Sequence, residues 1–292
     1  MSMTYAGDLT PQQAWDLLRE HPRAVLVDVR TEAEWRFVGL PDLTALGREP
    51  LTIEWVSFTG DRNTSFVDQL QAAGAKVVLD NVFATPLLQR SLDLGADVIV
   101  YSGTKHIDGQ GRVLGGAILG PQDYIDGPVQ QLIRHTGPAL SPFNAHTLLK
   151  GLETMPLRVR HSTDSALRIA RFLEADDAVS WVKYPFLESH PQYDLATSQM
   201  SGGGTVVTFE LAAAEGEGKK KAFELLNKLR VVDISNNLGD SKSLITHPAT
   251  TTHRAMGPEG RAAIGLSDGV VRLSVGLEDT DDLLEDFAQA LA

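Results

Sequence analysis

The chain has 292 residues, of which 42% are hydrophobic and 22% charged, and it contains no cysteine. This length allows two domains with a sizeable core, and no stretch approaches the roughly 20 apolar residues that a membrane span requires. The net charge of -12 opposes phosphate backbones, so we expect no nucleic acid partner. The lack of cysteine excludes disulfides, thiolate metal sites and cysteine nucleophiles. With no export signal at the start, we expect a globular, cytoplasmic protein.

The first stretch predicts a helix, a strand and a turn. Thr10 and Pro11 are typical of a helix start, and the helical pattern continues through Leu18. The apolar run 24–27 indicates a buried strand that ends at Asp28. The chain therefore begins like a small α/β unit.

The segment from 77 to 120 predicts alternating strands and helix. Apolar runs at 77–79, 98–101 and 113–119 indicate strands, with a helix at about 86–94. Because these runs lack a clean polar alternation, we expect strands covered on both faces, as in parallel α/β sheets.

The remainder predicts a long helix followed by a mixed layer. Residues 142–175 carry apolar residues at helical spacing, and Pro156 should kink or split that helix. Further strands are predicted at 179–182, 205–211, 231–234 and 270–275, with helices at about 220–229 and at the C-terminus. This order favours a smaller α+β domain.

Two residues that carry chemistry follow neighbouring predicted strands. Asp80 comes directly after the strand 77–79, and Lys105 follows the strand 98–101. If the strands are parallel, both residues lie at the carboxyl ends of the sheet, where open α/β folds bind ligands. A lysine amine for a Schiff base and a carboxylate for the pyridine nitrogen are what pyridoxal phosphate (PLP) needs. Ser102 and Thr104 add hydroxyl donors suited to a phosphate.

Each residue alone has a simpler interpretation. An aspartate after a strand is usually a turn or helix cap, and a lysine is usually solvated. The combination of Asp80 with the run 102–106 favours a cofactor site. We interpret His106 as a packing residue. No metal site is expected, because His247 and His253 lack helical i, i+4 spacing.

Several segments carry a family resemblance. They are VVLDNVFATP (77–86), VYSGTKHIDGQGRVLGG (100–116), LSPFNAHTLLKGLETMPLRVRHS (140–162), THPATTTH (246–253) and VVRLSVGLED (270–279). From about residue 70 onward the chain resembles the Cys/Met-metabolism PLP-dependent enzymes, in particular their O-succinylhomoserine sulfhydrylase branch. The resemblance implies a pyridoxal 5'-phosphate cofactor and methionine biosynthesis by transsulfuration.

The resemblance implies roles for the cofactor residues. Lys105 matches the lysine that forms the Schiff base and moves protons during replacement at the substrate γ-carbon. Asp80 matches the partner of the pyridine nitrogen, and Ser102 and Thr104 match phosphate ligands.

It also implies a substrate site. Arg272 matches the arginine that holds the substrate α-carboxylate, and its planar guanidinium suits a two-pronged hydrogen bond. The alternation in 271–275 independently places Arg272 and Ser274 on one face of a strand. Asn237 falls where relatives often carry a serine near that carboxylate. The implied reaction takes an O-succinylhomoserine-like amino acid and sulfide to homocysteine.

Residues 1–75 resemble instead the opening of a rhodanese-like sulfurtransferase domain, in LTPQQAWDLL (9–18), VLVDVRTEAEW (25–35) and GLPD (39–42). Sulfur transfer in such a domain needs a cysteine thiolate, which the chain lacks. We therefore expect Asp28 to be structural and Arg30 to pair with an acidic neighbour. The phosphate loop, stacking tyrosine and Tyr/Arg segment of the PLP family's N-terminal portion are not found.

The predicted architecture is α/β with three parts. They are a partial rhodanese-like segment (1–75), an incomplete large domain of PLP-dependent transferase fold type I (76–155) and an α+β C-terminal domain (156–292). Uncovered sheet surface predicts marginal stability or a homo-oligomer. Two alternatives remain open: a catalytically silent fusion that serves in packing, and a rhodanese-like sulfurtransferase without its cysteine.

Overall fold

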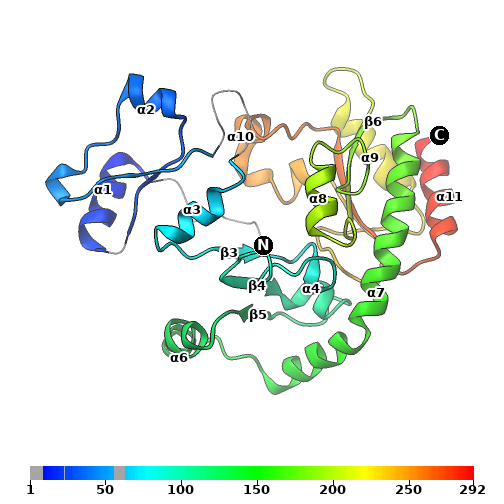
Figure 1. Ribbon diagram of the computed structural model, residues 1–292. Helices are drawn as coiled ribbons and strands as arrows, with labels where there is room; N and C mark the ends of the chain where they lie inside the picture. The colour runs from blue at the N-terminus through cyan, green and yellow to red at the C-terminus, as the bar shows by residue number, and fades with distance from the viewer. Residues whose placement is uncertain (1–8, 23, 56–62) are drawn as a thin grey trace. The chain divides into compact units, whose positions relative to one another are not determined.

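A computed structural model describes residues 9–22, 24–55 and 63–292 (Figure 1). Backbone contacts divide the chain into two compact units. One comprises residues 3–78 and 95–97, and the other is formed mainly by residues 79–94 and 98–292. The predicted boundary between residues 155 and 156 falls inside a single helix, so the three-part division stays a prediction.

The N-terminal unit is a small α/β arrangement. Helix α1 (Pro11–Glu20) starts where the sequence predicted, because Thr10 and Gln13 form a reciprocal cap. The Thr10 hydroxyl accepts from the Gln13 backbone N–H at 3.3 Å, and the Gln13 side chain accepts from the Thr10 N–H at 2.9 Å. Strand β1 (Val27–Asp28) pairs in parallel with β2 (Leu51–Thr52). The other elements are α2 (Glu32–Val38), η1 (Thr44–Leu46) and α3 (Phe66–Ala72).

A partly buried ion pair lies at the end of β1. The Asp28 carboxylate accepts hydrogen bonds from Arg30 Nη2 at 2.6 Å and Nε at 2.9 Å. The hydrogen bond from Arg30 is the main reason that the pKa of Asp28 is lowered to about 2. The expected local pairing of Arg30 is confirmed.

A three-stranded sheet carries the lysine predicted to be catalytic. Its order is β3 (Val78–Asp80), β4 (Val98–Ser102) and β5 (Gly116–Leu119). Asn81 N donates to Val100 O and Asp97 N donates to Val77 O, so the hydrogen bonds advance in the same direction along β3 and β4, as in parallel strands. The expectation of parallel strands is wrong for β5, which runs antiparallel to β4. The chain turns back beside β4, and Gly103 N donates to the Gly115 carbonyl at 2.7 Å, so β5 pairs with β4 in the antiparallel direction.

The helix between β3 and β4 is shorter than predicted. Helix α4 spans only Thr85–Leu88. The Asn81 side-chain amide donates to the Thr85 carbonyl at 3.2 Å and to the Gln89 carbonyl at 3.1 Å. The helix ends before Gln89, which has extended backbone angles and whose N–H still donates to the Thr85 carbonyl at 3.3 Å.

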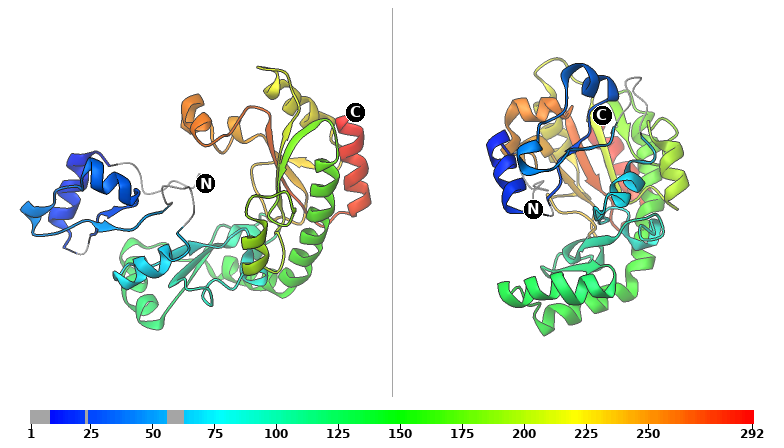
Figure 2. Two further views of the ribbon diagram at one scale, coloured as in Figure 1. Left: turned by 45° about the horizontal axis from the view of Figure 1, so that its top comes forward. Right: turned by 60° about the vertical axis from the view of Figure 1, so that its left-hand side comes forward.

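The long helix is continuous through its proline. Helix α7 spans Pro142–Glu174, and the Ser141 hydroxyl caps it by accepting from Asn144 N at 3.1 Å. Pro156 does not split the helix, although the ribbon changes direction in its first half (Figures 1 and 2). Between β5 and α7 lie α5 (Gln122–Tyr124), η3 (Ile125–Val129) and α6 (Gln130–Thr136).

The C-terminal region contains a five-stranded sheet of order β6-β7-β10-β9-β8. All neighbours are antiparallel except β8 and β9. The strands are β6 (Val179–Lys183), β7 (Val206–Leu211), β8 (Asp233–Ile234), β9 (Leu244–Thr246) and β10 (Val270–Ser274). The remaining helices are α8 (Tyr193–Gln199), α9 (Gly218–Lys228), η4 (Pro248–Thr250), η5 (Arg254–Met256), α10 (Gly257–Ala263) and α11 (Thr280–Leu291).

The main hydrophobic core lies between this sheet and helices α7, α9 and α11. Ile169 on α7, Phe209 on β7 and Phe287 on α11 are fully buried, and the two phenylalanine rings meet edge to face at 6.2 Å. In the part of the chain that the structure describes, no helix combines the length and apolarity needed to cross a bilayer.

Candidate functional site

Lys105 lies in a wide, π-helical turn, η2 (Gly103–Ile107), directly after β4. Its backbone angles, φ -87° and ψ -127°, are not helical, so the turn is distorted at the lysine itself. Gly103 N donates to the Gly115 carbonyl at 2.7 Å, and a Cβ on Gly103 would lie 3.0 Å from that oxygen. Glycine at 103 therefore lets the turn lie against the start of β5.

The Lys105 amine is half-buried and donates to the Asn237 side-chain oxygen. Burial, together with the positive charge of Arg272, lowers the pKa of Lys105 from its ordinary value. Among residues 9–22, 24–55 and 63–292, no carboxylate forms an ion pair with this amine. A larger share of the amine is thus neutral and able to attack a carbonyl.

Arg272 lies on β10 with one buried donor unused. Its Nη2 donates to the carbonyls of Asn236 at 2.8 Å and Asn237 at 3.3 Å. Its Nε is buried without a hydrogen-bond partner among the described residues. On the same face of the strand, the Ser274 hydroxyl accepts from Gly239 N at 2.9 Å. The predicted alternation is confirmed, because both polar side chains meet the loop 236–239.

Three candidate cofactor residues lie near the ends of β3 and β4. Asp80 is exposed and accepts from Val82 N at 3.1 Å, which is the turn role of the simpler interpretation. Ser102 and Thr104 are half-buried, and their hydroxyls make no hydrogen bond within the described chain. The structure joins Lys105, Asn237 and Arg272 by direct contacts and shows no ion pair between Asp80 and Lys105 in its described parts. The cofactor roles stay predictions.

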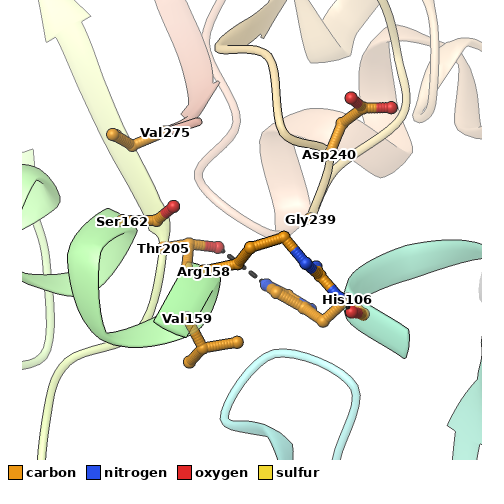
Figure 3. Close-up of a pocket in the computed structure, with 8 residues that line it drawn as sticks. All are labelled: His106, Arg158, Val159, Ser162, Thr205, Gly239, Asp240 and Val275. Atoms are coloured by element: carbon orange, nitrogen blue, oxygen red, sulfur yellow. Dashed lines mark hydrogen bonds between the residues drawn. The ribbon is translucent and has the colours of Figure 1, made fainter. Parts of the chain in front are cut away.

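His106, next to Lys105 in the turn η2, is buried. The interpretation of His106 as a packing residue is confirmed. Its Nε2 lies 2.9 Å from the Thr205 hydroxyl (Figure 3). Burial, assisted by the positive charge of Arg158, lowers the pKa of His106 to about 4, so the ring is neutral near pH 7. The cavity beside it measures about 10 Å³, room for a single water molecule at most.

Two functional residues, Asn81 and Arg158, were not predicted from the sequence, and both bind the segments around the predicted site residues. Asn81, directly after Asp80, also donates to the Tyr101 hydroxyl at 3.1 Å. Arg158 on α7 contacts the lysine turn. Its signal in the sequence is an arginine within a stripe of buried positions that includes Met155, Val159 and Ser162.

The fold is that of PLP-dependent enzymes of fold type I. The family described as "Cys/Met metabolism PLP-dependent enzyme" matches residues 64–292, and the chain belongs to that family. The match starts at residue 64, so the rhodanese-like character of residues 1–75 stays a prediction.

Three relatives illustrate the similarity. The chain is 74% identical over 221 residues to an O-succinylhomoserine sulfhydrylase of Mycobacterium tuberculosis, covering 76% of this chain and 54% of the relative. It is 45% identical over 219 residues to an L-methionine gamma-lyase of Pseudomonas putida, covering 75% and 54%. The crystal structure of a cystathionine gamma lyase of Micromonospora echinospora superposes with a TM-score of 0.76 at 30% identity, covering 95% of this chain and 79% of that one. The chain spans about half the length of the curated relatives it matches.

The family's cofactor is PLP, and the described residues fit such a group. The fit rests on a half-buried amine of lowered pKa, two hydroxyls without partners at the end of β4 and on the turn that follows it, and a buried guanidinium nitrogen without an acceptor. The hydroxyls and the guanidinium nitrogen lack partners that a phosphate or a carboxylate would supply, and the amine can attack an aldehyde.

Proposed function

We propose that the chain is a PLP-dependent enzyme of the transsulfuration type that converts O-succinylhomoserine and sulfide to homocysteine and succinate. The observation that carries this proposal is the Lys105 amine, half-buried, lowered in pKa and without a carboxylate partner in the described chain. The 74% identity to a sulfhydrylase supports the choice of reaction. Because the chain spans about half of that relative, the reaction of the whole relative is assigned to this chain only as a proposal.

Each residue has a part that its surroundings support. Ser102 and Thr104 would donate to the cofactor phosphate, and Asp80 would accept from the pyridine nitrogen. When bound, the cofactor supplies an electron sink for a substrate carbanion. The Lys105 amine would accept and return protons at its Nζ, for which a lowered pKa is suited.

Arg272 and Asn237 would bind the substrate carboxylate. The free Nε of Arg272 lies beside an Nη2 that now contacts only backbone carbonyls, so both nitrogens can turn to a carboxylate in a two-pronged hydrogen bond. The Asn237 amide nitrogen makes no hydrogen bond within the described residues and can donate to the same group.

The test is the visible absorbance of purified protein titrated with PLP. We expect a band of lysine-linked cofactor that is absent in Lys105→Ala and retained in Lys150→Ala, whose exposed amine pairs with Glu153 on α7. Homocysteine formation from O-succinylhomoserine and sulfide should then require Lys105.

An absent band, or a band unchanged in Lys105→Ala, would reject the proposal. That result would favour the alternative of a catalytically silent packing protein. Cyanide-dependent thiocyanate production would instead support the sulfurtransferase alternative.

A further inference from the structure

The guanidinium group of Arg158 binds the backbone of the turn that carries Lys105. Arg158 Nη1 donates to the His106 carbonyl at 2.9 Å, and Nη2 donates to the Ile107 carbonyl at 3.3 Å. Nη2 also donates to the Gly151 carbonyl of its own helix at 2.8 Å. One planar group therefore links α7 to the two residues that follow the lysine.

In the described chain, Arg158 forms no ion pair. Nε donates to the Thr154 hydroxyl at 3.1 Å, so every guanidinium nitrogen has a neutral partner. Within the described residues no carboxylate lies at ion-pair distance from it. Burial lowers the pKa of Arg158, and the more distant charges of Asp108 and Asp240 oppose that shift. A rigid guanidinium bound to backbone oxygens fixes geometry in a way that a lysine cannot reproduce.

Two glycines make this contact possible. A Cβ on Gly109, whose φ is +70°, would lie 2.0 Å from Arg158 Nη1. A Cβ on Gly151 would lie 2.1 Å from the Ile107 carbonyl oxygen. The helix and the turn are therefore in direct backbone contact, and Figure 3 shows the Arg158 side chain reaching from α7 to His106.

From this arrangement we propose that Arg158 is a positioning residue: by binding the carbonyls of His106 and Ile107, it fixes the direction in which the turn presents the Lys105 amine. The inference rests on the proposed function, because it assigns Arg158 a part in holding the cofactor lysine. Arg158 does not touch the amine, whose partner is Asn237.

The test compares two substitutions with a matched control. Arg158→Ala removes the guanidinium group, and Arg158→Lys keeps the positive charge but loses the planar pair of nitrogen donors. Arg160→Ala is the control, because Arg160 is an exposed arginine two residues further along α7 with no hydrogen bond to the described chain. Arg160→Ala removes the same charge without touching the turn.

The readout is the titration of Lys105 in protein without cofactor. Competitive labelling with acetic anhydride across a pH series, quantified on the peptide containing Lys105, gives the midpoint for that one amine. We expect both Arg158 variants to raise the midpoint by about half a pH unit or more, because a loosened turn lets water reach the amine. Arg160→Ala should leave it unchanged. Both Arg158 variants should also bind PLP several-fold more weakly.

Hydrogen exchange separates positioning from general unfolding. Peptides covering 103–109 should exchange faster in both Arg158 variants, while peptides from β7 and β10 stay protected. A folded Arg158→Ala or Arg158→Lys protein with the Lys105 midpoint of the wild type overturns the inference. If Arg158→Ala fails to fold, Arg158→Lys decides alone. Failure of the proposed function is a separate result, since a missing PLP band in the wild type leaves the Lys105 midpoint measurable.

Discussion

The two compact units differ in how they are held together. In the C-terminal sheet and its helices, aliphatic and aromatic side chains form one buried cluster of 21 residues. In the described part of the N-terminal unit, the buried hydrophobic side chains are Leu18, Leu43 and Ile53, and the buried Asp28 carboxylate at the end of β1 pairs with Arg30. Because hydrophobic burial is the dominant favourable contribution to folding, the C-terminal sheet should be the stable part of the chain.

The largest expected effect is Phe287→Ala. This side chain is fully buried against Phe209, so its loss should cost about 3–5 kcal/mol of unfolding free energy. The chain's four tryptophans allow a local measurement, because Trp181 lies on β6 and the others (Trp15, Trp35 and Trp55) lie in the N-terminal unit. In a protein whose other three tryptophans are changed to Phe, urea unfolding is followed by the fluorescence of Trp181. Phe287→Ala should move the midpoint of that transition to a much lower urea concentration.

The control for Phe287→Ala is a protein carrying Trp181→Phe, in which only the N-terminal tryptophans report. In that protein, Phe287→Ala should change the urea midpoint little, whereas Leu18→Ala should lower it. Equal shifts of both probes would mean that the two units unfold as one, and the contrast between them would be wrong.

His106 should give the next largest effect, and it depends on pH. Its pKa is about 4 when folded and 6.5 ordinarily, so folding favours the neutral ring. The stability is fully present above about pH 6.5 and is lost as pH falls toward 4, by roughly 3 kcal/mol at most. Urea unfolding of wild type and His106→Gln at pH 7.5 and 4.5 should show a flatter pH dependence in the variant. Parallel curves would contradict the buried neutral histidine.

Asp28→Asn tests the N-terminal unit and should have a smaller effect. The Asp28 pKa is lowered from 3.8 to about 2. Its contribution is therefore present above pH 3.8 and lost as pH falls toward 2. Because the Arg30 side chain is 34% exposed, solvent screens part of the attraction. In the Trp181→Phe protein, Asp28→Asn should lower the urea concentration at the unfolding midpoint at pH 7. Near pH 2 the midpoints of the variant and its parent should be the same.

The smallest effect is expected for Asp281→Asn, which breaks the ion pair with Arg168 between α11 and α7. Both side chains are more than half exposed, so the loss should stay below about 1 kcal/mol. Unfolding followed by Trp181 in low and high salt should show nearly the same midpoint for variant and wild type. A loss comparable to that of Phe287→Ala would mean that surface charge matters as much as the core.

Apolar runs predicted the elements that pack most fully. The strand predicted at 98–101 was found because its residues form a contiguous apolar run, and the strand predicted at 270–275 because apolar residues recur along it. Strand β9 was missed because its three residues have little pattern of their own, and it exists through pairing with β8 and β10 on either side. Helix α4 ends at Leu88, and neither this early end nor the Asn81 hydrogen bonds beside it follow from the apolar periodicity of the sequence.

The candidate site was predictable in its residues more than in its contacts. Motif resemblance named Lys105, Arg272 and Asn237, and the structure brings them together. The contacts of Arg158 with the lysine turn depend on where α7 passes, and this tertiary arrangement has no local signature. An arginine among buried helix positions was the one available clue.

The partner that holds the Lys105 amine lies 132 residues further along the chain, and Arg272 comes later still. A ribosome that translates this message therefore releases the lysine turn long before the loop and strand that hold its amine. Until β10 has emerged, the nascent polypeptide carries an amine without Asn237 or Arg272 beside it. Any reactivity that depends on both residues begins only after β10 has been synthesised.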